Sequence, residues 1–321
     1  MKPLFERIAV IGLGLLGGSV AAAARLRGVA TTVAGASRSK DARDFALRRQ
    51  WVDEVGNPME AASGADLVVL ATPVFAMVDV LRELAPALGS DAIVTDVGSV
   101  KAQLAETLPG LLPGGVCYVG SHPMAGSHER GIEYASADLF VDSPCCVVTD
   151  SGQPEAQRRV CSFWRALGAR VVMRDSATHD DQVAWMSHTP HVLAFGFAAA
   201  LARAPEGSGD LTGGGFRDFT RIAESDPELW SDILTANRKA LGAPLAAVSD
   251  AFRELGQAIE ANDLESVERW ISGARDALAL ANRSTSHAGS MDEVHASSQT
   301  TDPRTKADLR SGHESEDKPD E

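Results

Sequence analysis

Arg7-Ile-Ala-Val-Ile-Gly12-Leu-Gly14-Leu-Leu-Gly17 sets the architecture expected of this chain. An apolar, β-branched run leads into glycines at the spacing G-x-G-x-x-G, and the alanine-rich segment 19–26 that follows predicts a helix. In such a turn the first glycine permits the sharp bend, the second lets a diphosphate approach the backbone, and the third lets helix and strand pack. The helix N-terminus then faces the negative charge. The stretch predicts a dinucleotide site whose contacts are Gly12, Leu13, Gly14, Leu15, Leu16 and Gly17.

The same stretch has a second interpretation, a secretory signal. Residues 8–24 carry no charge and follow Lys2 and Arg7. Removing them would delete the predicted first strand and the phosphate turn, and glycines interrupt the apolar run. No other segment approaches the roughly 20 apolar residues of a membrane span. We therefore expect a cytoplasmic protein that does not enter a membrane.

Composition is that of a folded protein. The 321 residues are 44% hydrophobic, which is ample for a sizeable core and typical of about two domains. The net charge of −14 argues against a nucleic-acid groove, because such a groove needs a basic stripe. The four cysteines show neither metal-ligand spacing nor the pattern of a secreted disulfide framework, so they predict reduced thiols in the core.

Strand and helix patterns alternate over the first half of the chain. Apolar, β-branched runs occupy residues 7–11, 31–35, 66–71, 92–95, 116–119, 145–149 and 170–173. The alternation predicts an α/β, Rossmann-like domain over residues 1–175, with a doubly wound, mostly parallel sheet.

After Asp175 the strand signal stops. Helical patterns follow at residues 178–202, 227–241, 244–261 and 264–281, which predicts an all-helical domain over residues 176–284. Asp226-Pro227 is a favourable helix start. Residues 285–321 lack aromatic side chains and carry nine acidic against four basic residues, so we expect a disordered acidic tail there.

The end of the second predicted strand bears on the cofactor. NAD enzymes of this fold carry an acid about 20 residues beyond the glycine turn, to bind the adenosine ribose. Here that position holds Ser37, followed by Arg38, with no carboxylate before Asp41. A hydroxyl and a guanidinium suit a 2′-phosphate, so we predict NADP in preference to NAD. The alternative is that Arg38 is a solvated surface residue.

Polar side chains follow several predicted strands. Thr72 and Pro73 come after one strand, Ser99 after the next, and His122 after another. Because the carboxyl ends of parallel strands line the ligand crevice, these residues should converge on the nicotinamide end of the cofactor.

The motifs taken together resemble those of the prephenate dehydrogenase and arogenate dehydrogenase family of tyrosine biosynthesis, over residues 7–282. Besides the glycine turn the set comprises Asp96-x-Gly-Ser99-Val-Lys101, Gly120-x-His122-Pro-x-Ala-Gly126, His179-Asp180, Ser187-His188-x-Pro190-His191, Gly213-Gly-Gly-Phe-x-Asp218-Phe-Thr-Arg221 and Ser225-Asp226-Pro227-x-x-Trp230. The resemblance implies oxidative decarboxylation of a cyclohexadienol, with hydride passing to the nicotinamide and carbon dioxide leaving.

The resemblance also implies two catalytic residues. His122 would accept a hydrogen bond from the ring hydroxyl as hydride leaves, so its neutral form is required. Activity should then fall as the pH drops through the histidine range near 6.5. Ser99 would hold the hydroxyl and the nicotinamide face together, and its alternative role is a helix N-cap.

The remaining substrate-binding residues lie in the helical domain. Arg221 would pair with a substrate carboxylate, and Asp218, three residues earlier, would aim its guanidinium or merely form a surface ion pair. By resemblance His188, His191 and Trp230 belong to the substrate pocket, and Gly214 to a loop near the site of a neighbouring subunit. A homodimer through the helical domain is implied in the same way. His188 and His191 could also suggest a metal pair, but no third ligand accompanies them, so we expect no metal.

Other functions compete with this one. Arogenate differs from prephenate by an ammonium in place of a keto group, and His191 tilts the prediction toward prephenate. A 3-hydroxyacid dehydrogenase would need a lysine on the helix 178–202, which has none. A regulatory protein that senses NADP without turnover would have no need of Ser99, His122 and Arg221.

Overall fold

The computed structural model describes residues 2–126 and 129–296. The chain divides into two compact units, Met1–Ala247 and Val248–Glu321. All the residues predicted to form the site belong to the first unit.

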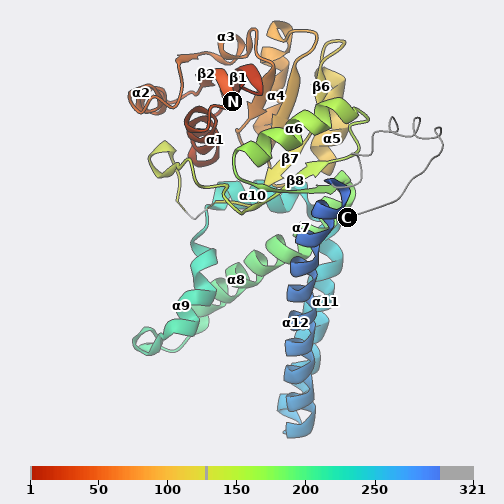
Figure 1. Ribbon diagram of the computed structural model, residues 1–321. Coiled ribbons are helices and arrows are strands. Elements are labelled where there is room, and N and C mark those ends of the chain that lie inside the picture. The colour runs from red at the N-terminus through yellow and green to blue at the C-terminus, as the bar shows by residue number, and fades with distance from the viewer. Residues whose placement is uncertain (1, 127–128, 297–321) are drawn as a thin grey trace, which may run out of the picture. The chain divides into compact units, whose positions relative to one another are not determined.

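A six-stranded parallel sheet forms the N-terminal part of the first unit (Figure 1). Its strands are β1 (Phe5–Ile11), β2 (Ala30–Ala36), β3 (Glu54–Gly56), β4 (Leu67–Leu70), β5 (Ile93–Asp96) and β6 (Cys117–Tyr118). The order is β3-β2-β1-β4-β5-β6, and Val10 of β1 pairs with Gly35 on one side and Val69 on the other. The strand order reverses between β1 and β4, and ligands bind at such a switch point. The predicted Rossmann-like sheet is confirmed.

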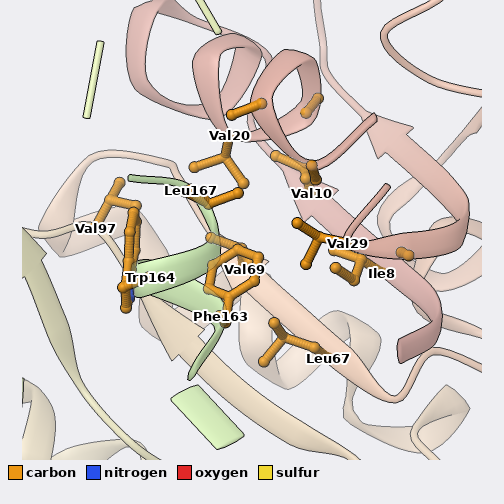
Figure 2. Close-up of a cluster of buried hydrophobic side chains, with 14 of the residues drawn as sticks. Ile8, Val10, Val20, Val29, Leu67, Val69, Val97, Phe163, Trp164 and Leu167 are labelled. Atoms are coloured by element: carbon orange, nitrogen blue, oxygen red, sulfur yellow. The ribbon is translucent and has the colours of Figure 1, made fainter. Parts of the chain in front are cut away.

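Both faces of this sheet are covered, because alternate residues of β1 point to opposite sides. Ile8 and Val10 belong to one buried cluster, which Figure 2 shows with Val20 of α1 and Phe163 of α6. Ala9 and Ile11 belong to a second cluster on the other face. The helices of the first cluster are α1 (Leu15–Leu26), α2 (Lys40–Arg48) and α6 (Pro154–Ala166). Those of the second are α3 (Pro58–Ala62), α4 (Met77–Leu84) and α5 (Ala102–Thr107).

A second, three-stranded sheet carries part of the site, which the sequence did not predict. It consists of β7 (Ser121–Pro123), β8 (Pro144–Val148) and β9 (Arg170–Arg174), with β7 antiparallel to β8 and β8 parallel to β9. The predicted strands 145–149 and 170–173 therefore exist but do not join the main sheet. β3 and β7 escaped prediction because each has three residues and lacks an apolar run.

The helix predicted over residues 178–202 is interrupted. It consists of α7 (Ser176–Val183), a π-helical turn (Ala184–His188) and α8 (Thr189–Ala200). Pro190 explains the interruption, since it has no N–H to continue the α-helical pattern and its ring crowds the preceding turn. Single π turns inside helices are frequent at functional sites, and this one ends at His188.

Further along, α9 (Gly214–Thr220) and α10 (Pro227–Ala236) complete the helices that surround the site. Asp226 caps α10 as predicted, because its carboxylate accepts the Leu229 N–H at 2.7 Å. The short 3₁₀ turns are η1 (Val74–Ala76), η2 (Ala85–Ala87), η3 (Pro109–Leu111), η4 (Ile132–Tyr134), η6 (Leu201–Arg203), η7 (Ser208–Leu211) and η8 (Arg221–Glu224).

The last two helices differ from the predicted ones in their ends. α11 (Arg238–Glu260) contains Pro244, so the break predicted before that proline lies at Asn237 instead. α12 (Leu264–Ala296) runs 15 residues past Ala281, so the start of the segment 285–321 is helical rather than disordered. Residues 297–321 lie outside the described part. Among the described helices, none is long and apolar enough to cross a membrane.

Candidate active site

The glycine turn after β1 forms a tight backbone cradle. Gly12 has φ +107°, and a Cβ there would lie 2.5 Å from the Ala71 carbonyl oxygen. A Cβ at Gly17 would lie 1.8 Å from the Gly12 carbonyl oxygen. Both positions therefore require glycine, as the sequence predicted, the first for its conformation and the second for the close approach of helix to turn.

The cradle opens into a cleft of about 1350 Å³. Gly14 precedes α1 without any side-chain cap, and a Cβ there would meet nothing within 4 Å. The backbone N–H groups at the start of α1 are thus free to bind an anion. The Thr72 hydroxyl also lines this cleft, buried and without a hydrogen-bond partner in the described chain. An uncapped helix N-terminus and an unsatisfied hydroxyl fit the diphosphate and ribose groups of a dinucleotide.

The far end of the cleft is basic. Ser37, Arg38 and Arg43 line it, and no hydrogen bond from the exposed Arg38 guanidinium occurs within the described chain. The Arg43 side chain donates to the backbone carbonyls of Ser37 and Arg38, which holds the loop at the end of β2. The Ser39 hydroxyl caps α2 by accepting the Ala42 N–H at 3.2 Å.

A chain of hydrogen bonds links His122 on β7 to α7. The His122 Nδ1 lies 2.9 Å from the His179 Nε2, and the His179 Nδ1 lies 2.8 Å from the Asp180 Oδ1. All three side chains are buried. The Asp180 carboxylate also accepts the backbone N–H groups of Lys101 and Ala102, at 2.7 and 2.9 Å. Asp180 therefore caps α5 from another helix, so that the predicted alternative role of Ser99 as the N-cap is not observed.

A buried ion pair fixes the strand that carries His122. The Lys101 ammonium binds both carboxylate oxygens of Asp96 and donates to the Ser121 carbonyl at 2.9 Å. The same carboxylate accepts the Ser121 N–H at 2.9 Å. Lys101 and Asp96 are fully buried, and such a pair is tolerated only when its remaining donors and acceptors are satisfied, as they are here. Both backbone groups of Ser121 are thereby held, one residue before His122.

The π turn and α10 bring aromatic rings together beside this network. His188 Nδ1 lies 3.0 Å from the Asn237 side-chain nitrogen, which also donates to the Asp180 carbonyl at 2.9 Å. Trp230 packs edge-on to His188 and stacks on His191, with ring centroids 3.7 Å apart. The His191 Nδ1–H donates to the Ser187 carbonyl at 2.9 Å. Of the residues predicted to bind substrate, His188 and His191 each contact Trp230.

Arg221 begins η8, directly after α9, and its guanidinium is exposed. Its positive charge contributes to lowering the pKa of His191, which links it to the same group of rings. No ion pair joins Asp218 to Arg221 in the described chain, since Asp218 lies on α9 and the helix type changes at Arg221. Gly214 is the first residue of α9, where a Cβ would meet nothing within 4 Å.

Burial holds His122 in its neutral form. Desolvation lowers the pKa of His122 well below 6.5, and electrostatic repulsion from the Lys101 ammonium and from any proton taken up by His179 or His188 acts in the same direction. Desolvation likewise lowers the pKa of His188 to about 4. If His122 is the base, we therefore expect the acid limb of activity below the pH of 6.5 that the sequence predicted, because the neutral histidine persists there.

The cofactor residues predicted from the sequence divide into two groups. Gly12, Leu13, Gly14, Ser37, Arg38, Thr72 and Pro73 line the cleft. Leu15, Leu16 and Gly17 form the first turn of α1 behind it, and Ser99 is half-buried between β5 and α5, outside the cleft lining.

Sequence reasoning missed the residues that support His122. The Lys101 and Asp96 side chains, His179, Asp180 and Asn237 were not assigned to the site, although four of them lie in motifs that suggested the family. No sequence pattern pointed to a role for Asn237 in the site, because it lies where the sequence predicts a continuous helix.

Comparisons with known proteins show the family of this chain. The model of the prephenate dehydrogenase nucleotide-binding domain matches residues 20–173, and that of the prephenate dehydrogenase dimerization domain matches residues 175–273. The chain is 36% identical over 266 residues to a cyclohexadienyl dehydrogenase of Zymomonas mobilis, covering 81% of this chain and 90% of that protein.

Two solved structures share both fold and sequence with it. Prephenate dehydrogenase of A. aeolicus, in complex with hydroxyphenyl propionate and NAD+, gives a TM-score of 0.78 at 27% identity, over 86% of this chain and 96% of that one. Synechocystis arogenate dehydrogenase gives 0.72 at 33% identity, over 85% and 99%. The chain therefore belongs to the prephenate dehydrogenase family of oxidoreductases, which includes arogenate dehydrogenases.

Proposed function

We propose that this protein uses NAD(P)+ to oxidise and decarboxylate prephenate to 4-hydroxyphenylpyruvate, in tyrosine biosynthesis. The observation that carries the proposal is the buried, neutral His122, held by His179 on a strand anchored through Ser121. A bound nicotinamide would supply the hydride acceptor. Because aromatisation of the ring drives the reaction, the protein has mainly to orient two partners and polarise one O–H bond.

In this proposal His122 is the catalytic base. Its free Nε2 accepts the hydrogen bond of the ring hydroxyl while hydride leaves the carbon that bears it. As carbon dioxide departs, the electron pair of the broken C–C bond completes the aromatic ring, and the hydroxyl proton returns to the phenol oxygen. Ser99, half-buried beside the end of β5, would orient the same hydroxyl against the nicotinamide.

Substrate binding is assigned to the helices. Arg221 would bind a carboxylate, because its guanidinium is always charged and exposed among neutral rings. Trp230, His188 and His191 would form one wall of the ring pocket. Asp218 and Gly214 would shape the approach to Arg221 from α9.

Arogenate is the second candidate substrate, and His191 favours it. A carbonyl oxygen only accepts, so the His191 Nδ1 must carry the proton that the Ser187 carbonyl binds. In the neutral ring, which burial favours by lowering the pKa of His191, Nε2 is then an acceptor. An acceptor suits the ammonium of arogenate better than the keto oxygen of prephenate, which reverses the preference drawn from His191 in the sequence.

We further propose that NADP is preferred to NAD. Arg38, Arg43 and Arg48 line the cleft near the end of β2 and the N-terminus of α2, where the Asp41 carboxylate also lies. A 2′-phosphate would gain charged hydrogen bonds in such surroundings.

The helical domain, residues 176–284, is proposed to join two copies of the chain. The match to a dimerization domain supports this, as do exposed aromatic side chains such as Phe197 on α8 and Phe219 on α9. Light scattering of the purified protein at micromolar concentration should give twice the mass of 33.8 kDa, and the single mass would contradict it. The cytoplasmic location stays a prediction.

One assay tests the function. Purified protein is given prephenate or arogenate, each with NADP+ or NAD+, and reduced nicotinamide and carbon dioxide are measured. We expect them to form in equal amounts, and NADP+ to give the higher kcat/KM. Arg38→Ala should reduce that ratio about fivefold for NADP+ and leave NAD+ unchanged. Tight NADP+ binding without turnover of either substrate would indicate a nucleotide sensor instead.

A further inference from the structure

The donors and acceptors around His122 determine one another. The Asp180 carboxylate receives two backbone N–H groups, at the start of α5, so it is the accepting partner of the His179 Nδ1. That nitrogen therefore carries a proton. When the His179 ring is neutral, its Nε2 then carries a lone pair and no proton. This nitrogen can only accept a hydrogen bond from the His122 Nδ1, which lies 2.9 Å away. The His122 Nδ1 is protonated in turn, and its Nε2 is left as the free base.

We propose that His179 and Asp180 are positioning residues that fix the reactive tautomer of His122 and take up its charge during the reaction. This inference rests on the proposed function, since it assigns a task to the base of that reaction. Neither residue touches the cleft that binds the dinucleotide.

The proton step follows from the same chain of contacts. When the His122 Nε2 takes the proton of the substrate hydroxyl, the ring would carry a positive charge in a buried place. The Nδ1–H proton then moves to the His179 Nε2, which leaves His122 neutral and His179 as an imidazolium beside the Asp180 carboxylate. The protons return along the same path when the phenol forms, so none is gained or lost overall.

The surroundings of His122 leave Asp180 as the acid that compensates this charge. Lys101 at the start of α5 is positive, and its ammonium is already paired with Asp96. His188, in the π turn, is kept neutral by burial. Asn237 on the far side of Asp180 carries no charge and holds the Asp180 carbonyl rather than its carboxylate. Among residues 2–126 and 129–296, the hydrogen bonds of His122 therefore lead to one acid, Asp180, through His179.

The first test needs no variant. Protein labelled with ¹⁵N in its histidine rings is examined by NMR at pH 7 without ligands, with His122 assigned from the spectrum of His122→Gln. We expect a protonated Nδ1 and a bare Nε2 on His122. A proton on Nε2 instead would overturn the inference.

The second test changes the network. Asp180→Asn removes the negative charge that balances an imidazolium on His179 and leaves one amide N–H facing a backbone N–H at the start of α5, so kcat should fall about 10²-fold or more while KM stays within threefold. Asp181→Asn, the same change at the exposed neighbouring position, should leave kcat unchanged. Asp180→Glu should recover part of the activity. An Asp180→Asn protein that is folded by circular dichroism and retains both the His122 tautomer and kcat would contradict the proposal.

The two proposals fail separately. The tautomer is measured in the free protein, so failure to oxidise prephenate or arogenate would overturn the proposed function and leave the tautomer result standing. A proton on the His122 Nε2 in an enzyme with full turnover would overturn this inference alone.

Discussion

The nucleotide cleft and the histidine network are built in opposite ways. The diphosphate part of the cleft is made by backbone and by glycines without side chains, in the six residues from Gly12 to Gly17. The network is made by buried side chains that hydrogen-bond to one another, from Asp96 on β5 to Asn237 after α10. Binding a shared cofactor needs only a preformed backbone surface, whereas orienting a single base needs every neighbouring donor and acceptor to be fixed. The two regions should therefore respond differently to substitution and to pH.

The largest effect is expected at the reacting end of the network. His122→Asn should lower kcat about 100-fold or more, because the ring hydroxyl loses its acceptor. The dissociation constant of the cofactor should not change, since the cleft is intact. Steady-state kinetics and cofactor titration measure the two quantities, and an unchanged kcat would remove His122 from the mechanism.

Arg221 tests the substrate end. Arg221→Ala should raise KM for the cyclohexadienol about 30-fold and change kcat by less than threefold, because it removes a charged contact made in both ground and transition state. Arg217→Ala, which removes a guanidinium from the preceding turn of α9, is the matched control and should leave KM unaltered. Equal KM values for the two variants would argue against a carboxylate at Arg221.

Acid should destabilise the network and not the cleft. The pKa of His188 is about 4 in the folded protein and near 6.5 when unfolded, so the unfolded chain binds more protons between these values. The contribution of His188 to the free energy of unfolding is fully present above pH 6.5 and is lost as the pH falls toward 4. Between pH 7 and pH 5 we expect urea unfolding to report a loss of about 1 to 2 kcal/mol that His188→Asn lacks. If the free energy of unfolding depended on pH equally in the original protein and in His188→Asn, His188 would be excluded as the cause.

Gly14 separates cofactor binding from folding. In Gly14→Ala the new Cβ meets no protein atom within 4 Å, but it stands where the diphosphate approaches the backbone. The cofactor should bind about tenfold more weakly, while thermal unfolding changes little. Gly89→Ala, also in open space but remote from the cleft, is the control. Normal cofactor affinity in Gly14→Ala would mean that the diphosphate lies elsewhere.

The contrast also explains what could be predicted from the sequence. Gly12, Gly14 and Gly17 are close together in the chain, so their spacing alone predicts the turn. The strand before the turn ends in an apolar run, and β4 beside it is apolar throughout. The alternation of strands and helices in the main sheet and the cap at Asp226 follow from equally local signals.

The histidine network had no comparable local signal. His179 and Asp180 act on His122 from 57 and 58 positions away, through a second sheet whose strand β7 is too short to predict. The π turn depends on Pro190 and on packing against Trp230. The helical pattern of the sequence alone therefore predicts one unbroken helix. Motif resemblance pointed to His122 and His188 there, but not to the contacts that favour their protonation states.

In the proposed reaction, His122 and Arg221 act on one small ring beside the cofactor. A crystal structure with NADP+ and 4-hydroxyphenylpyruvate tests this most directly. We expect the phenol oxygen within hydrogen-bond distance of the His122 Nε2 and the product carboxylate on the Arg221 guanidinium. A product bound away from His122, or a carboxylate held by another cation, would contradict it.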